Sequence, residues 1–261
     1  MAKGETYEQF TEKFVPKRTT DNCYTPPGVY EAVRQWAVAQ FGLEGAEVVC
    51  PFYPGGDYEH FPYPEGCVVI DNPPFSIYAR IVRFYLARGI RFLLFAPALT
   101  QLVVDADVTY LTAFANITYE NGALVRTSFT TNLMPGTRLW TAPALHSAVQ
   151  QAADDYLRTV RRDLYKVKKR AAKKKYRYPD HLLTSATVGR IAVRGVDLRL
   201  PSAECTYLNR AAGVELFGGG LLLTERAAAE RAAAERVAAE RAAAEELIPI
   251  EIDPLEPPAE E

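Results

Sequence analysis

Apolar residues recur at helical spacing near the start of the chain and then give way to short continuous runs. Residues 28 to 41 place Val29, Val33 and Trp36 on one face, which predicts a helix. The extended chain before this helix ends at Tyr24-Thr25-Pro26-Pro27. The apolar run from Ala46 to Phe52 is broken by Pro51 and enters a loop rich in turn residues. This pattern predicts a short strand followed by a loop.

A second group of elements centres on a continuous β-branched run. Residues 67 to 70 are typical of a strand buried on both faces, and the run ends at Asp71-Asn72-Pro73-Pro74. Residues 76 to 88 have helical spacing with Gly89 as the C-terminal cap, and residues 91 to 95 resume as a strand. The order strand, helix, strand predicts a right-handed parallel crossover.

Two further apolar runs, residues 115 to 119 and 124 to 129, flank an Asn121-Gly122 turn signal. We expect a β-hairpin at the sheet edge. Residues 188 to 200 favour one or two short strands, and Gly218-Gly219-Gly220 indicates a flexible joint, since no Lys-Ser or Lys-Thr follows to make a phosphate loop.

Glu-Arg-Ala-Ala-Ala pentads between Glu225 and Glu245 predict a helix, because Ala has the highest helix propensity. A period of five residues advances about 140° around a helix of 3.6 residues per turn, so the alanines spiral. We therefore expect a solvated single helix, with a coiled coil or a helix that docks a protein partner as the alternative.

The pattern divides the chain into five parts. These are a polar leader (1–20), a compact Rossmann-like α/β domain (21–145), a basic helical and mixed extension (146–217), the glycine joint with the pentad helix (218–248), and an acidic, proline-rich tail (249–261).

Composition narrows the class of protein. The formal net charge of −2 hides a basic tract and an acidic tail. The four cysteines lack paired C-x-x-C spacing and the three histidines have no partner at metal-ligand spacing, so we expect free thiols and no metal site. The start of the chain is too polar for a signal peptide, and no apolar run reaches the roughly 20 residues of a membrane helix. We expect a cytoplasmic protein without a membrane partner.

The segment Asp71-Asn72-Pro73-Pro74-Phe75 carries the most specific chemistry. Two prolines fix the backbone so that carbonyls point outward, and the Asn72 side-chain oxygen with the Pro73 carbonyl offers two acceptors to an amino group. Phe75 offers an aromatic face for an extruded base. The structural alternative is a turn that ends a strand and caps the next helix, with Phe75 in the core.

At these residues the chain resembles the adenine-specific DNA methyltransferases, whose hallmark is Asp/Asn/Ser-Pro-Pro-aromatic after the fourth strand of a Rossmann-like sheet. It is similar in particular to the EcoRI-family enzymes and related proteins of phages and mobile elements. The resemblance extends over roughly residues 24 to 133 and includes Thr131-Asn132-Leu133 after the hairpin.

The resemblance implies roles for individual residues. Asn72 and the Pro73 carbonyl would hold the adenine amino group, and Phe75 would stack on its ring. The segment from Cys50 to Gly56 matches the loop that binds S-adenosylmethionine, with Tyr24 and Thr25 beside the methionine end. The implied cofactor-binding residues are Tyr24, Thr25, Pro51, Phe52, Gly55, Gly56 and Asp71.

Two departures from the family pattern concern the cofactor. Cys50 replaces the acid that opens the cofactor loop, and the interval from Gly56 to Cys67 is too short for a strand-helix-strand that supplies a ribose-binding carboxylate. Asp57 and Glu59 are the nearest substitutes, with exposed turn residues as the alternative. S-adenosylmethionine is therefore either held differently than in the family, with binding weakened, or not held.

A tyrosine-interleaved basic tract is the second functional signal, with eleven Lys and Arg residues between Arg158 and Arg177. Clustered cations release counterions from phosphates, and tyrosines stack or hydrogen-bond, so the tract favours DNA as a partner; a solvated linker is the alternative. The candidate DNA-binding residues are Arg161, Arg162, Lys168, Lys169, Arg170, Lys173, Lys174 and Lys175.

Three hypotheses of function result. The first is an enzyme that transfers methyl from S-adenosylmethionine to adenine N6 in DNA by positioning and electrostatics. The second is a catalytically degenerate, methyltransferase-like DNA-binding protein of a mobile element, acting in partition, maintenance or defence evasion. The third is a scaffold whose Asn72–Phe75 turn is structural and whose pentad helix recruits a partner.

Overall fold

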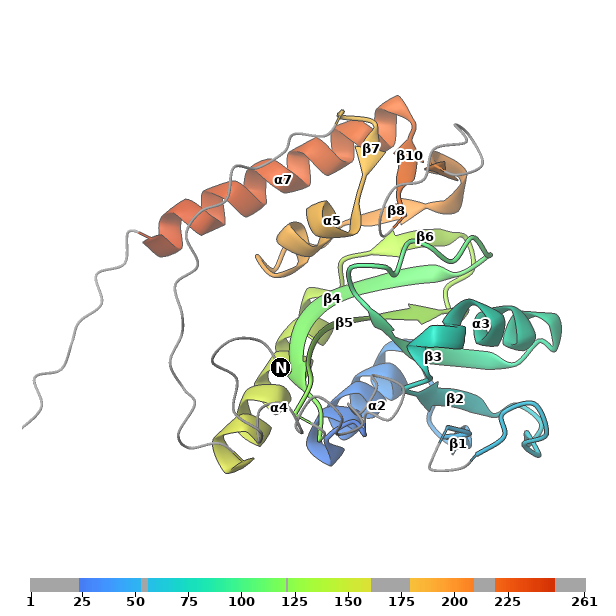
Figure 1. Cartoon of the computed structure of the whole chain (residues 1–261). Helices are drawn as coiled ribbons and strands as arrows, with labels where there is room; N and C mark the ends of the chain where they lie inside the picture. Colours follow the sequence, from blue (N-terminus) through green and yellow to red (C-terminus); the bar gives the residue numbers. More distant parts are fainter. Residues whose placement is uncertain (1–23, 53–55, 121, 161–178, 209–218, 247–261) are drawn as a thin grey trace, which may run out of the picture.

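The computed structural model describes residues 24–52, 56–120, 122–160, 179–208 and 219–246. They form a mixed seven-stranded sheet with helices on both faces and a smaller three-stranded sheet beside it (Figure 1). The large sheet has the order β1-β2-β3-β5-β4-β6-β8. Its strands are β1 (Val48–Val49), β2 (Val68–Asp71), β3 (Arg91–Pro97), β4 (Thr109–Thr118), β5 (Leu124–Thr131), β6 (Thr137–Trp140) and β8 (Arg199–Pro201).

The first predicted helix is confirmed as α2 (Pro27–Phe41). Pro27 occupies its first position, where the missing N–H leaves no intrahelical bond unmade. Gly42 ends it with φ 61°, the left-handed conformation that glycine adopts without strain. Val29 and Val33 are completely buried, so the apolar face predicted from spacing is the one that packs.

The predicted parallel crossover is also confirmed. β1 pairs in parallel with β2, and β2 with β3. Between β2 and β3 lie a short 3-10 turn, η2 (Phe75–Ile77), and helix α3 (Tyr78–Ala87), which Gly89 follows with φ 64°. The carboxyl ends of all three strands therefore meet at one edge of the sheet.

The predicted hairpin is present, but its expected place at the sheet edge is wrong. β4 and β5 pair antiparallel, with a register shift between Leu111 and Ala115. β5 is inserted beside β3, while β6 pairs with β4 and β8 pairs with β6. The large sheet therefore ends with the short strands β6 and β8, and the hairpin lies inside the sheet.

Two helices cover one face of the sheet. α2 and α4 (Pro143–Val160) pack there through Val33, Leu145 and Val149, in the same apolar cluster as β-strand residues such as Leu93. The opposite face carries Val69, Phe92 and Leu94, which pack in a second cluster with α3 and the smaller sheet. α4 crosses the boundary expected at residues 145 and 146 and packs against β4 and α2.

The smaller sheet has the order β7-β10-β9, with strands β7 (Leu182–Leu183), β10 (Leu221–Leu223) and β9 (Cys205–Tyr207). Short strands were expected between residues 188 and 200, but helix α5 (Ser185–Ala192) covers the first part of this range. The prediction is confirmed only by β8, which begins at Arg199. The Thr184 side chain caps α5 by accepting a hydrogen bond from the Thr187 amide, a local signal for a helix start. A further 3-10 turn, η3 (Ser202–Glu204), precedes β9.

The predicted flexible glycine joint is wrong at the two glycines that the structure describes. Gly219 and Gly220 are buried, and Gly219 forms a parallel bridge with Leu102. A Cβ atom on Gly219 would lie 2.5 Å from the Leu102 carbonyl oxygen, so the glycine permits close backbone contact. Gly218 lies outside the described residues.

The pentad repeat forms helix α7 (Glu225–Glu246), as predicted. The expectation that this helix is solvated on all sides is wrong. Ala227, Arg231, Ala234 and Ala238 are at most 7% exposed and share one face at spacings of four, three and four residues. Because the pentad does not match the helical period, this face includes Arg231, which lies 3.3 Å from Asp180 and 3.5 Å from Glu235. α7 packs against α5 and β10 of its own chain.

No helix within the described residues is long and apolar enough to span a membrane.

Candidate functional site

Two predicted site segments lie at the carboxyl edge of β1 and β2. The segment after β1 begins at Cys50, and the segment after β2 begins at Asp71. The start of α2 reaches the same edge, because the Tyr30 hydroxyl lies 2.9 Å from the Cys50 sulfur. In parallel α/β sheets ligands bind at this edge, so the placement makes it the candidate site.

Cys50 follows β1 directly, and its surroundings suit a neutral thiol. Its sulfur also lies 3.4 Å from the Ile70 carbonyl oxygen. Burial raises the pKa of Cys50 above its usual value, and the nearby Asp71 charge adds to that rise. Burial and the contact with Cys50 likewise raise the pKa of Tyr30, so both groups stay protonated at neutral pH. Tyr30 was not among the site residues predicted from the sequence. Its position one turn into the helix that follows Pro26 could have indicated that its hydroxyl lies at the site.

Asp71 connects the two loops. Its Oδ2 accepts a hydrogen bond from the Phe52 amide at 2.7 Å, and its Oδ1 accepts one from the Asn72 amide at 2.8 Å. Burial raises the pKa of Asp71 to about 6, and the two amide bonds oppose this rise. Both carboxylate oxygens of Asp71 thus accept hydrogen bonds from backbone amides, so Asp71 positions the turn.

The Asn72–Phe75 turn has one buried and three half-buried residues. Pro73 is buried, while Asn72, Pro74 and Phe75 keep part of their surface. Pro74 has an extended backbone (φ −56°, ψ 122°), so the chain turns only at η2. The Phe75 ring packs edge-on to Tyr78 at a centroid distance of 6.5 Å. One side of the ring thus packs on the protein, and the rest is accessible.

Tyr24 and Thr25 lie at the start of the described chain. Tyr24 is 48% exposed, and its carbonyl oxygen accepts a hydrogen bond from the Glu120 amide at 3.2 Å. The Thr25 hydroxyl oxygen is buried and forms no hydrogen bond within the described residues. Pro51 is buried and Phe52 half-buried, so the described start of the Cys50–Gly56 segment packs as a folded turn.

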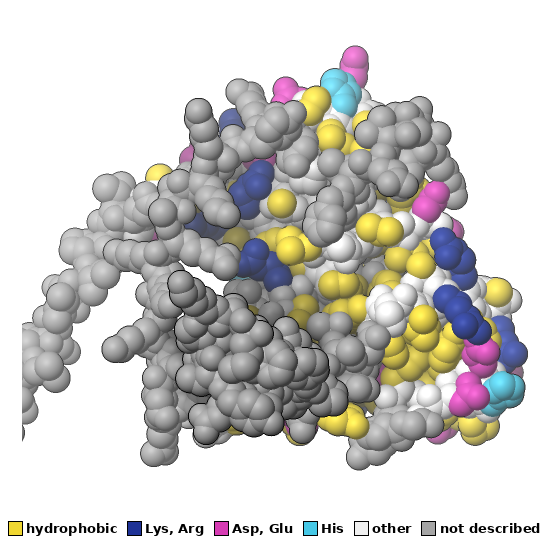
Figure 2. All heavy atoms as spheres, viewed as in Figure 1, with side chains coloured by type: hydrophobic (Ala, Val, Ile, Leu, Met, Phe, Trp, Pro, Cys, Tyr) yellow, Lys and Arg dark blue, Asp and Glu magenta, His cyan; other side chains and the backbone are white. Residues whose placement is uncertain are grey.

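The segment from Gly56 to Cys67 contains an aromatic cluster and no strand or helix. Tyr58 is 7% exposed and packs its ring 5.3 Å from Phe52 and 5.1 Å from Phe84. The Tyr63 hydroxyl donates to the Tyr58 carbonyl at 2.6 Å. In Figure 2 the face over α3 and this segment shows hydrophobic side chains beside basic and acidic ones. Packed aromatic rings, and no strand or helix, thus occupy the described part of the chain between β1 and β2.

Asp57 and Glu59, the two substitute carboxylates named from the sequence, are already paired. Asp57 lies 2.7 Å from His60 Nδ1, and Glu59 forms an ion pair with Arg80. Asp71 is likewise occupied, because its two oxygens accept hydrogen bonds from the Phe52 and Asn72 amides. The carboxylates that the sequence offered for a cofactor ribose therefore already have protein partners.

Several predicted site residues lie outside the described residues. Gly55 is one of them, whereas Gly56 is described and exposed. All the candidate DNA-binding residues belong to this group: Arg161, Arg162, Lys168, Lys169, Arg170, Lys173, Lys174 and Lys175. Within the described ranges, no group of three or more His, Cys, Asp or Glu side chains is placed to hold a metal ion.

Comparison of the chain with protein-family models, curated proteins and solved structures finds no match in any of the three.

Proposed function

We propose that this chain is a methyltransferase-like DNA-binding protein that holds an unpaired adenine at Asn72-Pro73-Pro74-Phe75 and does not retain S-adenosylmethionine as a cofactor. The observation that carries the proposal is the place of the turn. It leaves the carboxyl end of β2, between the carboxyl ends of β1 and β3, and Asp71 fixes it to Phe52. In open α/β sheets, ligands bind outside the carboxyl ends of the strands.

The number of strands supports a degenerate member of the class. The motif follows the fourth strand in the similar enzymes, whereas here it follows β2, the second described strand. The missing pair corresponds to the strand-free interval between Gly56 and Cys67. The proposed base-binding turn is thus kept, while the part that supplies a ribose-binding carboxylate is replaced by packed aromatic rings.

The chemistry of the turn suits an exocyclic amino group. A carbonyl and a side-chain amide oxygen accept two N–H bonds, and an aromatic face stacks on a ring. DNA affinity itself would come from the basic tract, whose role is inferred from sequence. The free thiols of the described Cys50, Cys67 and Cys205 agree with a reducing cytoplasm as the compartment.

The test compares binding to duplex DNA with one unpaired adenine against the same duplex with an unpaired thymine, measured by fluorescence anisotropy. Asn72→Ala and Phe75→Ala should each weaken the adenine complex by about tenfold, because an acceptor or a stacking face is lost. Asn116→Ala, an exposed asparagine on β4, is the matched control. The turn would be a structural cap if folded Asn72→Ala binds the adenine duplex with unchanged affinity. The same conclusion would follow if Asn72→Ala unfolds the protein but the folded fraction that remains keeps its affinity.

The second candidate is an active adenine-N6 methyltransferase, favoured by the same position of the turn. Calorimetric titration with S-adenosylmethionine separates the two. We expect a dissociation constant above about 100 μM, which corresponds to less than about 5.5 kcal/mol of binding free energy. Tight, saturable binding, together with adenine methylation in whole-genome modified-base sequencing that Asn72→Ala and Phe75→Ala abolish, would establish the enzyme instead.

A separate experiment tests the basic tract. Changing Lys173, Lys174 and Lys175 to Gln should flatten the salt dependence of DNA binding by roughly 0.9 log units per lost phosphate contact. An unchanged slope would show that the tract is a linker.

A further inference from the structure

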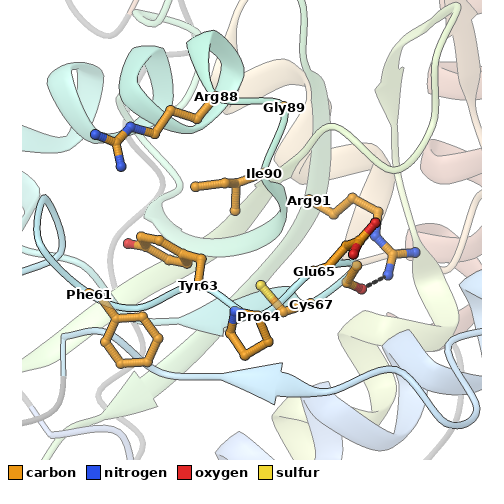
Figure 3. Close-up of a pocket in the computed structure, with 10 residues that line it drawn as sticks. Phe61, Tyr63, Pro64, Glu65, Cys67, Arg88, Gly89, Ile90 and Arg91 are labelled. Atoms are coloured by element: carbon orange, nitrogen blue, oxygen red, sulfur yellow. Dashed lines mark hydrogen bonds between the residues drawn. The ribbon is translucent and has the colours of Figure 1, made fainter.

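A cavity of about 470 Å³ opens at the edge of the sheet opposite the candidate site. It lies at the amino-terminal ends of β2 and β3, where Val68 pairs with Arg91. Figure 3 shows Phe61, Tyr63 and Pro64 on one side of it and Ile90 on the other. A volume of several hundred Å³ is that of a small-molecule site.

The aromatic wall of this cavity comes from the segment that distinguishes this chain from the similar enzymes. Phe61 and Tyr63 are half-buried, with their rings 5.0 Å apart. The hydroxyl of Tyr63 bonds to the Tyr58 carbonyl and lies 3.2 Å from the Tyr85 hydroxyl, so this ring is held in place. The Tyr63 ring therefore gives the cavity a fixed face on which a ring can stack, with the Phe61 ring tilted by 58° beside it.

Two arginines line the cavity without a carboxylate partner. Arg91 donates to the Gly66 carbonyl oxygen, a neutral acceptor, and Arg88 lies 4.5 Å from the centre of the Phe84 ring. Within the described residues neither forms an ion pair, in contrast to Arg80, which pairs with Glu59. Both guanidiniums thus have N–H donors that no carboxylate of the described chain occupies.

The two ends of the cavity differ in charge. In Figure 3, Glu65 lies beside Arg91 at one end, while Arg88 is at the other end with Tyr63 and Phe61. The Glu65 carboxylate opposes anion binding next to Arg91. Arg88, held over the Phe84 ring and adjoining the aromatic wall, is the better partner for an anionic group.

We propose that this cavity binds a small planar ligand with an anionic group, its ring against Phe61 and Tyr63 and its anion on Arg88. Nucleotides and aromatic carboxylates share this chemistry. The site lies at the opposite end of β2 from Asn72 and is independent of the proposed adenine site. A pyrimidine nucleotide is the suitable probe, because it lacks the adenine that the Asn72–Phe75 turn is proposed to bind.

The experiment is calorimetric titration of the full chain with uridine monophosphate, uridine, benzoate and benzamide. Each anion should bind saturably and at least about tenfold more tightly than its uncharged counterpart. Arg88→Gln should remove this advantage, whereas Arg88→Lys should restore part of it. Arg83→Gln, which changes an exposed arginine on α3 that does not line the cavity, should leave the affinity within about twofold.

The probes also identify the source of the ligand. Binding of uridine monophosphate alone supports a nucleotide, and binding of benzoate with the same dependence on Arg88 supports aromatic anions in general. Absence of saturable binding by both anions, equal affinity of uridine and uridine monophosphate, or binding that folded Arg88→Gln does not weaken would overturn the proposal.

Discussion

The carboxylate of Asp71 accepts a 2.7 Å hydrogen bond from the backbone amide of Phe52. This bond joins the last residue of β2 to the loop after β1, and it fixes the two segments between which the candidate site lies. Asp71 is only 9% exposed, so the bond is shielded from water. The relative position of the two loops therefore depends on a buried carboxyl group whose pKa is raised to about 6.

The raised pKa of Asp71 predicts a specific dependence of stability on pH. The folded protein holds this proton more tightly than the unfolded chain, whose aspartate pKa is about 3.9. The free energy of unfolding contributed by Asp71 should therefore fall as pH rises from about 4 to about 6 and stay constant above that window. Urea unfolding across this range should show wild type losing about 2 kcal/mol relative to Asp71→Asn. A difference that stays constant, or grows in favour of wild type, would contradict this assignment.

Placing an acid at position 50, as the proposed resemblance would require, should destabilise the protein without creating a cofactor site. In Cys50→Asp a carboxylate would face the Ile70 carbonyl oxygen and lie near Asp71, so charge repulsion and desolvation should lower the free energy of unfolding by about 1 to 3 kcal/mol. Cys50→Ser keeps a small hydrogen-bonding group beside Tyr30 and should cost less. Urea unfolding measures both variants, and a gain of S-adenosylmethionine affinity in Cys50→Asp would show that the remaining site is intact.

The elements closest to the candidate site could be predicted from sequence because their signals are local. The apolar run before Asp71 and the helical spacing after it predict β2 and α3, and the Pro73-Pro74 pair marks the turn between them. Left-handed Gly89 follows α3, as expected from its place after the helical pattern. In each case, neighbouring residues determine the conformation.

The remaining parts depend on contacts between distant residues. The Tyr30–Cys50 contact joins residues 20 positions apart, and β8 pairs with β6 from about 60 residues away. Strands of three or four residues carry too little pattern to reveal their partners. The burial of one face of α7 was not predicted, because the composition of α7 predicts a stable helix by itself. The surface against which this face packs belongs to α5, which lies far away in the sequence.

Gly219 should tolerate substitution much less well than another left-handed glycine. Gly219 and Gly45 have φ values of 69° and 83°, so alanine costs about 1 to 2 kcal/mol of backbone strain at either position. Only at Gly219 does the added Cβ meet backbone, 2.5 Å from the Leu102 carbonyl oxygen, since nothing lies within 4 Å at Gly45. Urea unfolding should show Gly219→Ala less stable than Gly45→Ala by at least about 1 kcal/mol. Equal losses would mean that Leu102 and Gly219 are not in close contact.

The docked face of α7 gives the last prediction. Ala234 is 7% exposed and belongs to the same apolar cluster as Val188 and Ile191, whereas Ala229 is exposed on the same helix. Ala234→Gln introduces a larger, polar side chain into a packed contact and should lower the free energy of unfolding by about 2 kcal/mol or more. Ala229→Gln makes the same chemical change in water, and because Gln is nearly as good a helix former as Ala it should change stability by less than about 0.5 kcal/mol. Urea unfolding followed by tryptophan fluorescence reports on the large sheet, because Trp140 lies on β6. A transition shifted only by Ala234→Gln would show that α7 unfolds together with this sheet, whereas equal behaviour of the two variants would show that the helix is solvated on all sides.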